Sequence, residues 1–196
     1  MVAEQVFGEN GFAGARTQDI AQRAGVNKAM IHYYFDTKEK LYHAMLDRIL
    51  FDLIKLTQDV TTPEVPPNQL VEDYIRAFFH YVARHRYFSR LTPMDLGSGS
   101  PYLHNIIVNF FRPLFKRGEK FLEEGMASGE CKQHAPRQLL LRIYGMTMSY
   151  FADAEFIRLL YDEDPSCESM LEERLEACFD IIFHTLGCDR PAIGGS

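Results

Sequence analysis

The spacing of apolar residues is the feature of this sequence that most constrains its fold. Along most of the 196 residues, apolar side chains recur at intervals of three and four, which is the period of an amphipathic helix. No run of alternating β-branched residues ends in an Asn-Gly or Asp-Gly turn, so the pattern of a β-hairpin is missing. The sequence therefore predicts an all-α protein.

The periodic segments predict a series of helices, and the long ones are expected over residues 38–59, 68–85, 102–128, 136–161 and 166–187. The stretch TTPEVPP (61–67) ends the first of these with three prolines and is the expected hinge. TPMDLGSGSP (92–101) is expected to form a loop or a short helix. Pro113 cannot donate a hydrogen bond to the carbonyl of Asn109, so we expect it to kink its helix and open space within the bundle.

Composition sets the class of protein. With 46% hydrophobic and 24% charged residues, the chain resembles a globular domain rather than a disordered segment. The opening MVAEQVFGENGF lacks the features of a secretory signal, and no apolar run is long enough to cross a membrane. The four cysteines show no C-x-x-C step, so we expect reduced thiols and no metal site, with a redox-sensing pair as an alternative. These features predict a cytoplasmic protein.

The net charge of −6 is unevenly distributed along the chain. Residues 1–50 contain six basic and six acidic residues, so the whole acidic excess lies in residues 51–196. Because a nucleic acid is a polyanion, the N-terminal part is the part better suited to bind one. We predict two domains, a head of residues 1–45 and a body of residues 46–196.

Residues 17–35 predict two short helices joined by a tight turn. Thr17 can cap the first helix, and Gly25 can adopt the left-handed conformation that ends it. Val26 and Asn27 can then staple and cap the second helix. The expected product is a helix-turn-helix.

The second of these helices has two different faces. Ile31 and Phe35 are four residues apart and can pack inward. The other face is formed by Lys28, Ala29, His32 and Tyr33. A small residue flanked by polar and aromatic ones suits a helix that lies close to base edges in a major groove. Taken singly, each of these residues could instead belong to a core cluster or a solvated surface, so the DNA interpretation depends on their agreement.

The stretch GFAGARTQDIAQRAGVNKAMIHYYFDTKEKLY resembles the helix-turn-helix signature of TetR-type bacterial transcriptional regulators, over about residues 6–42. The resemblance rests on Ile20-Ala21, Ala24-Gly25-Val26, Tyr34-Phe35, Lys38 and Leu41 at the family's spacing. It implies an all-helical homodimer with a three-helix DNA-binding head and a larger ligand-binding body, whose C-terminal helices pair across the dimer axis. The remaining 150 residues or so resemble the family only in architecture.

The resemblance also implies roles for single residues. It places Thr17 and Gln18 at the start of the motif that enters the groove, and it makes Lys28, Ala29, His32 and Tyr33 the reading face, with Tyr34 and Lys38 as phosphate contacts. The position of Lys38 beside a helix N-terminus also suits a phosphate.

Two departures from the family pattern affect the expected DNA contacts. Many relatives carry Tyr where this chain has His32, so the base preference there is left open. Family members usually have a short basic arm and a full first helix before the position of Phe7, whereas this chain begins within that helix. We expect fewer phosphate contacts, and weaker binding, without such an arm.

The last long helix carries two apolar stripes, of which one comprises Leu171, Leu175, Cys178 and Ile182 and the other Phe179, Phe183 and Leu186. Two stripes can bury two surfaces, one in the chain's own bundle and one against a partner. We therefore expect a homodimer through helices 136–161 and 166–187. The alternative is a helix that lies deep in the core of a monomer.

The central helices are rich in aromatic and sulfur side chains, and a subset near Pro113 is expected to line an apolar cavity. The candidate ligand-binding residues are Phe78, Tyr81, His85, Asn109, Phe110, Tyr144 and Met148. An effector in this cavity would shift the surrounding helices and change the distance between the two DNA-binding heads of a dimer.

These patterns predict a ligand-responsive regulator that binds a palindromic double-stranded DNA operator. The resemblance implies a repressor that leaves the operator when a small apolar or aromatic effector binds, and the sequence leaves the alternative of an activator open. The effector itself is unknown from the sequence. We expect no catalytic residues and no cofactor, because the metal, nucleophile and phosphate motifs of enzymes are missing. The alternative is a helical ligand-binding protein without a DNA function.

Overall fold

The structure is a computed structural model that describes residues 2–59, 65–90 and 101–191, and every regular element in these ranges is a helix. In chain order the elements are α1 (Val2–Gly14), α2 (Thr17–Ala24), α3 (Lys28–Phe35), α4 (Lys38–Asp59), α5 (Pro67–Arg84), α7 (Pro101–Ile106), the π-helix η1 (Ile107–Phe111), α8 (Arg112–Ser128), α9 (Pro136–Ala152), α10 (Ala154–Tyr161) and α11 (Glu168–Leu186). The all-α prediction is confirmed.

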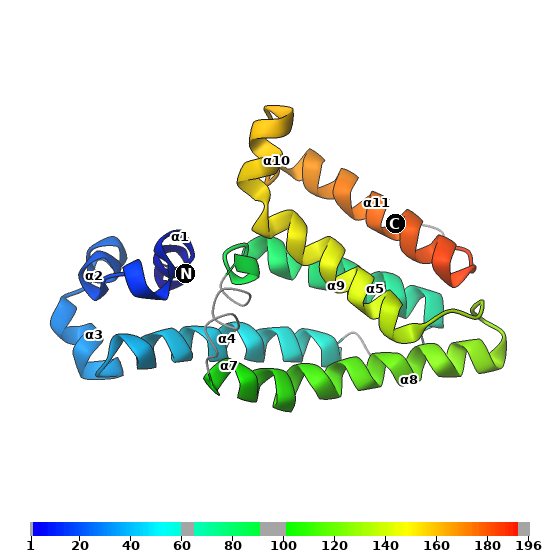
Figure 1. The fold of residues 1–196 in the computed structure, drawn as a ribbon, viewed down its shortest axis with the longest axis horizontal. Coiled ribbons are helices and arrows are strands. Elements are labelled where there is room, and N and C mark those ends of the chain that lie inside the picture. Colours follow the sequence, from blue (N-terminus) through cyan, green and yellow to red (C-terminus); the bar gives the residue numbers. More distant parts are fainter. Residues whose placement is uncertain (1, 60–64, 91–100, 192–196) are drawn as a thin grey trace.

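The helices form a small head and a larger body, and α4 runs from the first into the second (Figure 1). Helices α1 to α3 lie at one end of the molecule. In the body, α9 packs against α5, α8 and α11, while α4 packs against α5. The predicted boundary between residues 45 and 46 lies within α4, so a single helix connects the two parts. None of the described helices is long and apolar enough to cross a membrane.

The core of the head is an aromatic cluster between α1 and α4. The rings of Phe7 and Tyr42 lie edge to face with centroids 4.8 Å apart, and the ring of Phe12 lies 5.2 Å from that of Tyr42. Phe7 is completely buried. Such aromatic pairs add stability beyond the burial of their area, so the cluster fixes α1 on the first turns of α4.

The turn between α2 and α3 forms as the sequence predicts. Gly25 has φ 67° and ψ 26°, which is the left-handed conformation, and the N–H of Val26 donates to the carbonyl of Ala21 at 3.0 Å. The side chain of Asn27 accepts a hydrogen bond from the N–H of Ala29 at 2.8 Å and caps α3. The predicted cap at Thr17 is wrong, because α2 begins at Thr17 and its N-cap is Arg16, without a side-chain cap.

Two of the predicted long helices are interrupted. The helix expected over 136–161 breaks at Asp153 into α9 and α10. The break frees carbonyl groups in the last turn of α9, and Arg90 donates a hydrogen bond to that of Ala152 at 3.1 Å. No Pro or Gly marks this break, so the sequence did not indicate it.

The helix expected over 102–128 contains a π-helical turn, η1, directly before Pro113. Pro113 has no N–H and its ring would clash with the carbonyl four residues earlier. The N–H of Arg112 instead donates to the carbonyl of Ile107, five residues back. The helix is thus irregular near Pro113, as predicted. The irregularity is a π-turn, which has one residue more than a regular α-helical turn.

The two apolar stripes of the last helix do not face different partners. Leu175, Cys178 and Ile182 of the first stripe, and all three members of the second, are buried within the chain itself. Leu171 is half-buried against the same core. The two stripes therefore do not supply a separate surface for a partner, and α11 keeps an outer side on which Ile181 is exposed. Of the expected hinge, residues 61–64 lie outside the described ranges, as do residues 92–100 of the expected loop.

Candidate DNA-binding face and effector cavity

Helix α3 presents a face of exposed polar and aromatic side chains. Tyr33 is 83% exposed and Tyr34 68%, and their rings meet edge to face 5.2 Å apart. Ile31, on the opposite side, is buried. Two phenol rings in solvent stabilise the folded monomer little, so their exposure indicates a surface that receives another molecule. The predicted inward face is confirmed at Ile31, while the DNA contacts themselves stay predictions.

The remaining predicted face residues lie where they can reach the same molecule. Lys28 and Ala29 are exposed on the first turn of α3, and Gln18 is exposed at the start of α2, where Thr17 is half-buried. The ring Nδ1 of His32 lies 3.2 Å from the carbonyl oxygen of Asp36. When this nitrogen carries the proton, it donates to that carbonyl, and Nε2 is left as an acceptor on the outer side of the neutral ring.

Sequence reasoning missed two exposed residues of this surface. Met30 is 47% exposed and lies three positions before Tyr33, so the helical period could have placed it on this side of α3. Arg16 is exposed at the N-cap of α2 and adds a cation beside Thr17. A guanidinium beside a helix N-terminus is a favourable place for a phosphate.

Lys38 has a structural role that the sequence did not predict. Its Nζ donates to the carbonyls of Phe12 at 2.8 Å, Ala15 at 3.1 Å and Ala13 at 3.3 Å, and it lies 4.7 Å from the centre of the Phe12 ring. An ammonium group has three donors, and three carbonyls already receive them. The phosphate contact of Lys38 stays a prediction, and a direct bond to a phosphate requires one of these carbonyls to be released.

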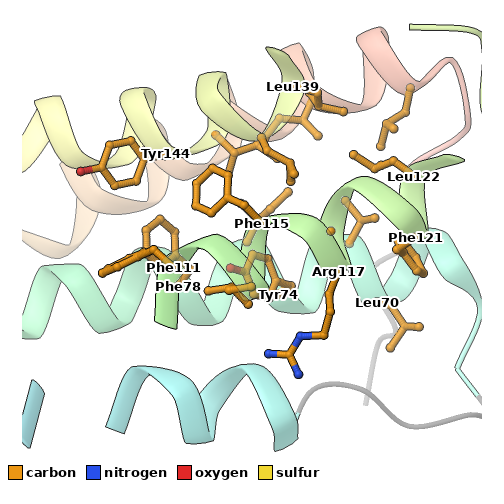
Figure 2. A pocket seen from close by; sticks show the side chains of 18 of the residues that line it. Leu70, Tyr74, Phe78, Phe111, Phe115, Arg117, Phe121, Leu122, Leu139 and Tyr144 are labelled. Carbon is orange, nitrogen blue, oxygen red and sulfur yellow. The ribbon is translucent and has the colours of Figure 1, made fainter. Parts of the chain in front are cut away.

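A cavity of about 290 Å³ lies in the body between α5, α8 and α9 (Figure 2). Leu53 of α4 and two residues of α11, Ile182 and Leu186, complete the wall. Almost all of the lining is aliphatic or aromatic, and the polar groups come from Tyr74, Arg117 and Tyr144. An apolar cavity with a few polar groups is the usual form of a small-molecule site.

Two of the seven predicted ligand residues, Phe78 and Tyr144, line this cavity. The other five lie elsewhere: Tyr81 and His85 face the head, Asn109 and Phe110 are exposed on η1, and Met148 is buried outside the described lining. The π-turn of η1 contains one residue more than a regular helical turn. This extra residue explains why Phe111, and not the predicted Phe110, lines the cavity.

Sequence reasoning missed Tyr74, although Leu70, Tyr74 and Phe78 are spaced four apart and all line the cavity from α5. Burial raises the pKa of the Tyr74 phenol, and the positive charge of Arg117 opposes that rise only in part. Burial also raises the pKa of Tyr144. Both phenols therefore stay neutral and keep a hydroxyl proton that can be donated in a hydrogen bond.

Two of the residues that miss the cavity, Tyr81 and His85, connect α5 to α4 and α1. Nδ1 of His85, at the end of α5, lies 2.9 Å from Oε2 of Glu4 in α1. The imidazole of His85 stacks on the ring of Tyr81, with centroids 4.6 Å apart, and the Tyr81 hydroxyl donates to the carbonyl of Ile49 in α4. Burial raises the pKa of Tyr81 above its ordinary value, so this hydroxyl keeps its proton. The last turn of α5 is thus attached to both α1 and α4.

The four cysteines are free thiols. Cys131, after α8, and Cys188, after α11, lie close enough for a hydrogen bond between their sulfur atoms. Burial raises the pKa of both thiols, which keeps them protonated and slows their oxidation. The reduced state of the cysteines stays a prediction, as does the alternative of a redox-sensing pair, for which Cys131 and Cys188 are the pair that the structure brings together.

Comparison with known proteins finds two family models along the chain. A family model described as bacterial regulatory proteins of the tetR family matches residues 2–45, and one described as a tetracyclin repressor-like C-terminal domain matches residues 67–182. The transcriptional regulator RutR of Escherichia coli K12 is 29% identical over 148 residues, which cover 76% of this chain and 69% of RutR. The transcriptional repressor NicS of Pseudomonas putida is 31% identical over 86 residues, which cover 44% of this chain and 41% of NicS.

Solved structures share the whole fold. The ketosteroid transcriptional regulator KstR2 of Mycobacterium tuberculosis has a TM-score of 0.75 at 16% identity, covering 93% of this chain and 90% of KstR2. The regulator PfmR of Thermus thermophilus has a TM-score of 0.73 at 19% identity, covering 94% of this chain and 98% of PfmR. At such identities the likeness concerns the fold alone. The family models, however, match the head and most of the body, and they show that this chain belongs to the TetR family of bacterial transcriptional regulators.

Proposed function

We propose that this ligand-responsive, DNA-binding regulator is a repressor that binds a palindromic operator as a homodimer and leaves it when an apolar effector fills the cavity. The exposed face of α3 carries the proposal, because it presents Tyr33 and Tyr34 to solvent on a capped, well-fixed helix. The alternative of a ligand-binding protein without a DNA function leaves this face without a purpose. Bacterial DNA lies in the cytoplasm, so the proposed location is cytoplasmic.

An apolar surface on α10 supports the homodimer. Its exposed side chains are Phe156, Leu159, Leu160 and Tyr161, each at least 58% exposed. Ile181 of α11 is also exposed, at 47%. A contiguous apolar surface on a monomer marks an interface. The expected dimer contact therefore uses the outer sides of α10 and α11, and the buried stripes of α11 have no part in it.

Helix α5 provides a physical route from the cavity to the head. Its middle turns line the cavity with Tyr74 and Phe78, while its last turn holds α1 through His85 and α4 through Tyr81. A molecule that separates α5 from α8 must displace this last turn as well, because a packed helix moves as a unit. The effector needs only to bind more tightly to the conformation that cannot hold the operator.

Selection from random duplex DNA tests the proposal. We expect the purified protein to enrich a palindrome at moderate salt, with affinity falling steeply as salt rises. Lys28→Ala should weaken this binding, whereas Lys116→Ala, which removes an exposed lysine of α8, should leave it unchanged. Enrichment of no sequence by the full chain would contradict the proposal. Equal loss in both variants would place the DNA on another surface.

A further inference from the structure

One charged side chain lines the effector cavity. Among the described lining residues, Arg117 of α8 is the only one with a formal charge. Figure 2 shows the side chain reaching from α8 past Tyr74, with its guanidinium group at the edge of the lining. Arg117 is exposed, so this charge lies where the cavity wall meets solvent. A cation in this position can bind the polar end of a molecule whose apolar part is enclosed.

The guanidinium of Arg117 is available for such a bond. In the part of the chain that the structure describes, it forms no ion pair, whereas nearby cations do: Lys120 lies 3.6 Å from Glu124, and Arg137 lies 3.2 Å from Glu119. Arginine presents a planar set of donors that fits the two oxygens of a carboxylate. Among the described residues, none competes with an outside anion for these donors through an ion pair.

Tyr74 supplies a second donor beside this charge. Its phenol is mostly buried, and its hydroxyl makes no hydrogen bond to any described residue. Tyr74 and Arg117 both line the cavity, and Figure 2 shows the Arg117 side chain passing Tyr74. A guanidinium and a neutral hydroxyl are both donors, and together they suit an acceptor with negative charge. These two donors do not favour the binding of a cationic headgroup.

The rest of the cavity limits the size and nature of the remaining part of the molecule. Its volume of about 290 Å³ corresponds to roughly ten water molecules, at about 30 Å³ each in the liquid. The walls opposite Arg117, on α9 and α11, are Leu, Ile and aromatic side chains. A molecule of about ten non-hydrogen atoms with a hydrocarbon body matches both limits.

We propose that the effector is an amphipathic carboxylic acid, with its carboxylate bound by Arg117 and the Tyr74 hydroxyl and its hydrocarbon body enclosed between α5, α8 and α9. This inference rests on the proposed function, since it names the chemical class of molecule that the effector cavity takes. The carboxylate gives specificity and the apolar walls give most of the affinity.

Calorimetric titration with paired probes of equal length tests the class. Octanoate should bind at least tenfold more tightly than octanamide or octanol, because the neutral probes lack the charge that Arg117 recognises. Arg117→Gln should remove this preference while octanol affinity is kept. Lys116→Gln, which changes a neighbouring exposed cation outside the described lining, should keep it. Tyr74→Phe should weaken octanoate severalfold. 3-Phenylpropanoate distinguishes an aromatic from a linear body.

The outcomes separate this inference from the function on which it rests. If octanol or octanamide binds as tightly as octanoate and releases DNA, the cavity is an effector site and the carboxylate assignment is wrong. If the Arg117→Gln variant still binds octanoate more tightly than octanol and octanamide, the assignment of Arg117 as the carboxylate partner is also wrong. If none of the probes binds, both the carboxylate class and the placement of the effector in this cavity fail. Loss of the preference in Arg117→Gln alone supports the assignment.

Discussion

The side chain of Lys38 stabilises the fold of the head, whereas the sequence pattern predicts that it contacts a DNA phosphate. The carbonyls that it binds belong to the last residues of α1 and the connection to α2, which have no helical partners of their own. A cation at the C-terminal end of a helix is also favoured by the helix dipole. Lys38 therefore holds the beginning of α4 against the end of α1.

Replacing Lys38 by Ala should lower the free energy of unfolding by about 2 kcal/mol, because hydrogen bonds to a charged group contribute about 1.5–3 kcal/mol. The matched control is Lys40→Ala, which removes an exposed pair with the exposed Asp36 and should cost less than about 1 kcal/mol. Urea unfolding followed by circular dichroism measures both. Similar losses in the two variants would show that the three carbonyl contacts add nothing.

Single residues also show what the sequence can and cannot predict. Gly25 and Asn27 were predictable because their roles depend on their own backbone and near neighbours. Tyr81 and His85 were placed wrongly in the cavity because their direction depends on how α5 crosses α4 and α1. That crossing depends on packing between segments that are distant in the sequence. The spacing of residues within one helix does not predict such packing.

At the scale of elements, the sequence predicted the long helices. It predicted only one of the two places where these helices are interrupted. Pro113 indicated an irregularity, but the π-turn that it produces shifts the following residues by one position, which a regular period cannot anticipate. The break at Asp153 separates α9 from α10 without a proline or glycine. Because of that break, the exposed apolar surface lies on a short separate helix rather than on the second stripe of α11.

Leu159→Glu in α10 should dissociate the dimer. A carboxylate buried in an apolar interface costs several kcal/mol, so we expect the dissociation constant to rise at least about a hundredfold. Phe51→Glu is the control, since Phe51 is 66% exposed on α4, a helix that lies away from α10 in Figure 1. Light scattering across a dilution series gives the oligomeric state. A dimer that persists in Leu159→Glu would exclude α10 from the interface.

The contact between α5 and α1 should control the stability of the head. His85→Ala removes one partner of the buried Glu4 carboxylate, so we expect faster hydrogen exchange in the amides of α1. Exchange in α9 should stay unchanged, since α9 packs against α5, α8 and α11 rather than the head. The exposed neighbour Arg84→Ala serves as the control. Equal exchange in all three proteins would argue against a mechanical connection at His85.

At the scale of the whole molecule, Arg190 attaches the C-terminal segment to the body. It donates hydrogen bonds to Glu72 of α5 at 2.9 Å and to Glu176 of α11, and it lies 4.3 Å from the centre of the Phe179 ring. Burial raises the pKa of Glu72, but Arg190 and Arg76 outweigh it and lower the pKa overall. The hydrogen bond from Arg190 lowers the pKa of Glu176.

This arrangement predicts a pH-dependent stability. Carboxyl groups with a lowered pKa in the folded state stabilise it above their unfolded pKa of about 4.3, and the stabilisation is lost as the pH falls through the lowered value. At pH 7, Arg190→Gln should cost about 1–2 kcal/mol, because the ion pairs are partly exposed and Glu72 keeps its pair with Arg76. The difference from the unchanged protein should shrink below about pH 4.3. Thermal unfolding across pH 2–8 measures it, and a constant difference would contradict the ion-pair origin.

The continuity of α4 has a mechanical consequence. The helix starts at Lys38 in the head, and its residue Leu53 lies in the cavity wall, so it acts as a lever. Its 22 residues span about 33 Å at a rise of about 1.5 Å per residue. A tilt of about 5° over this length moves the far end by about 3 Å, which is the length of a hydrogen bond. In a symmetric dimer both ends move, and the spacing of two heads that must match grooves about 34–36 Å apart changes by about 6 Å. A molecule of about ten non-hydrogen atoms can therefore rotate an intact helix slightly, and the two heads then no longer match the two major grooves of the operator.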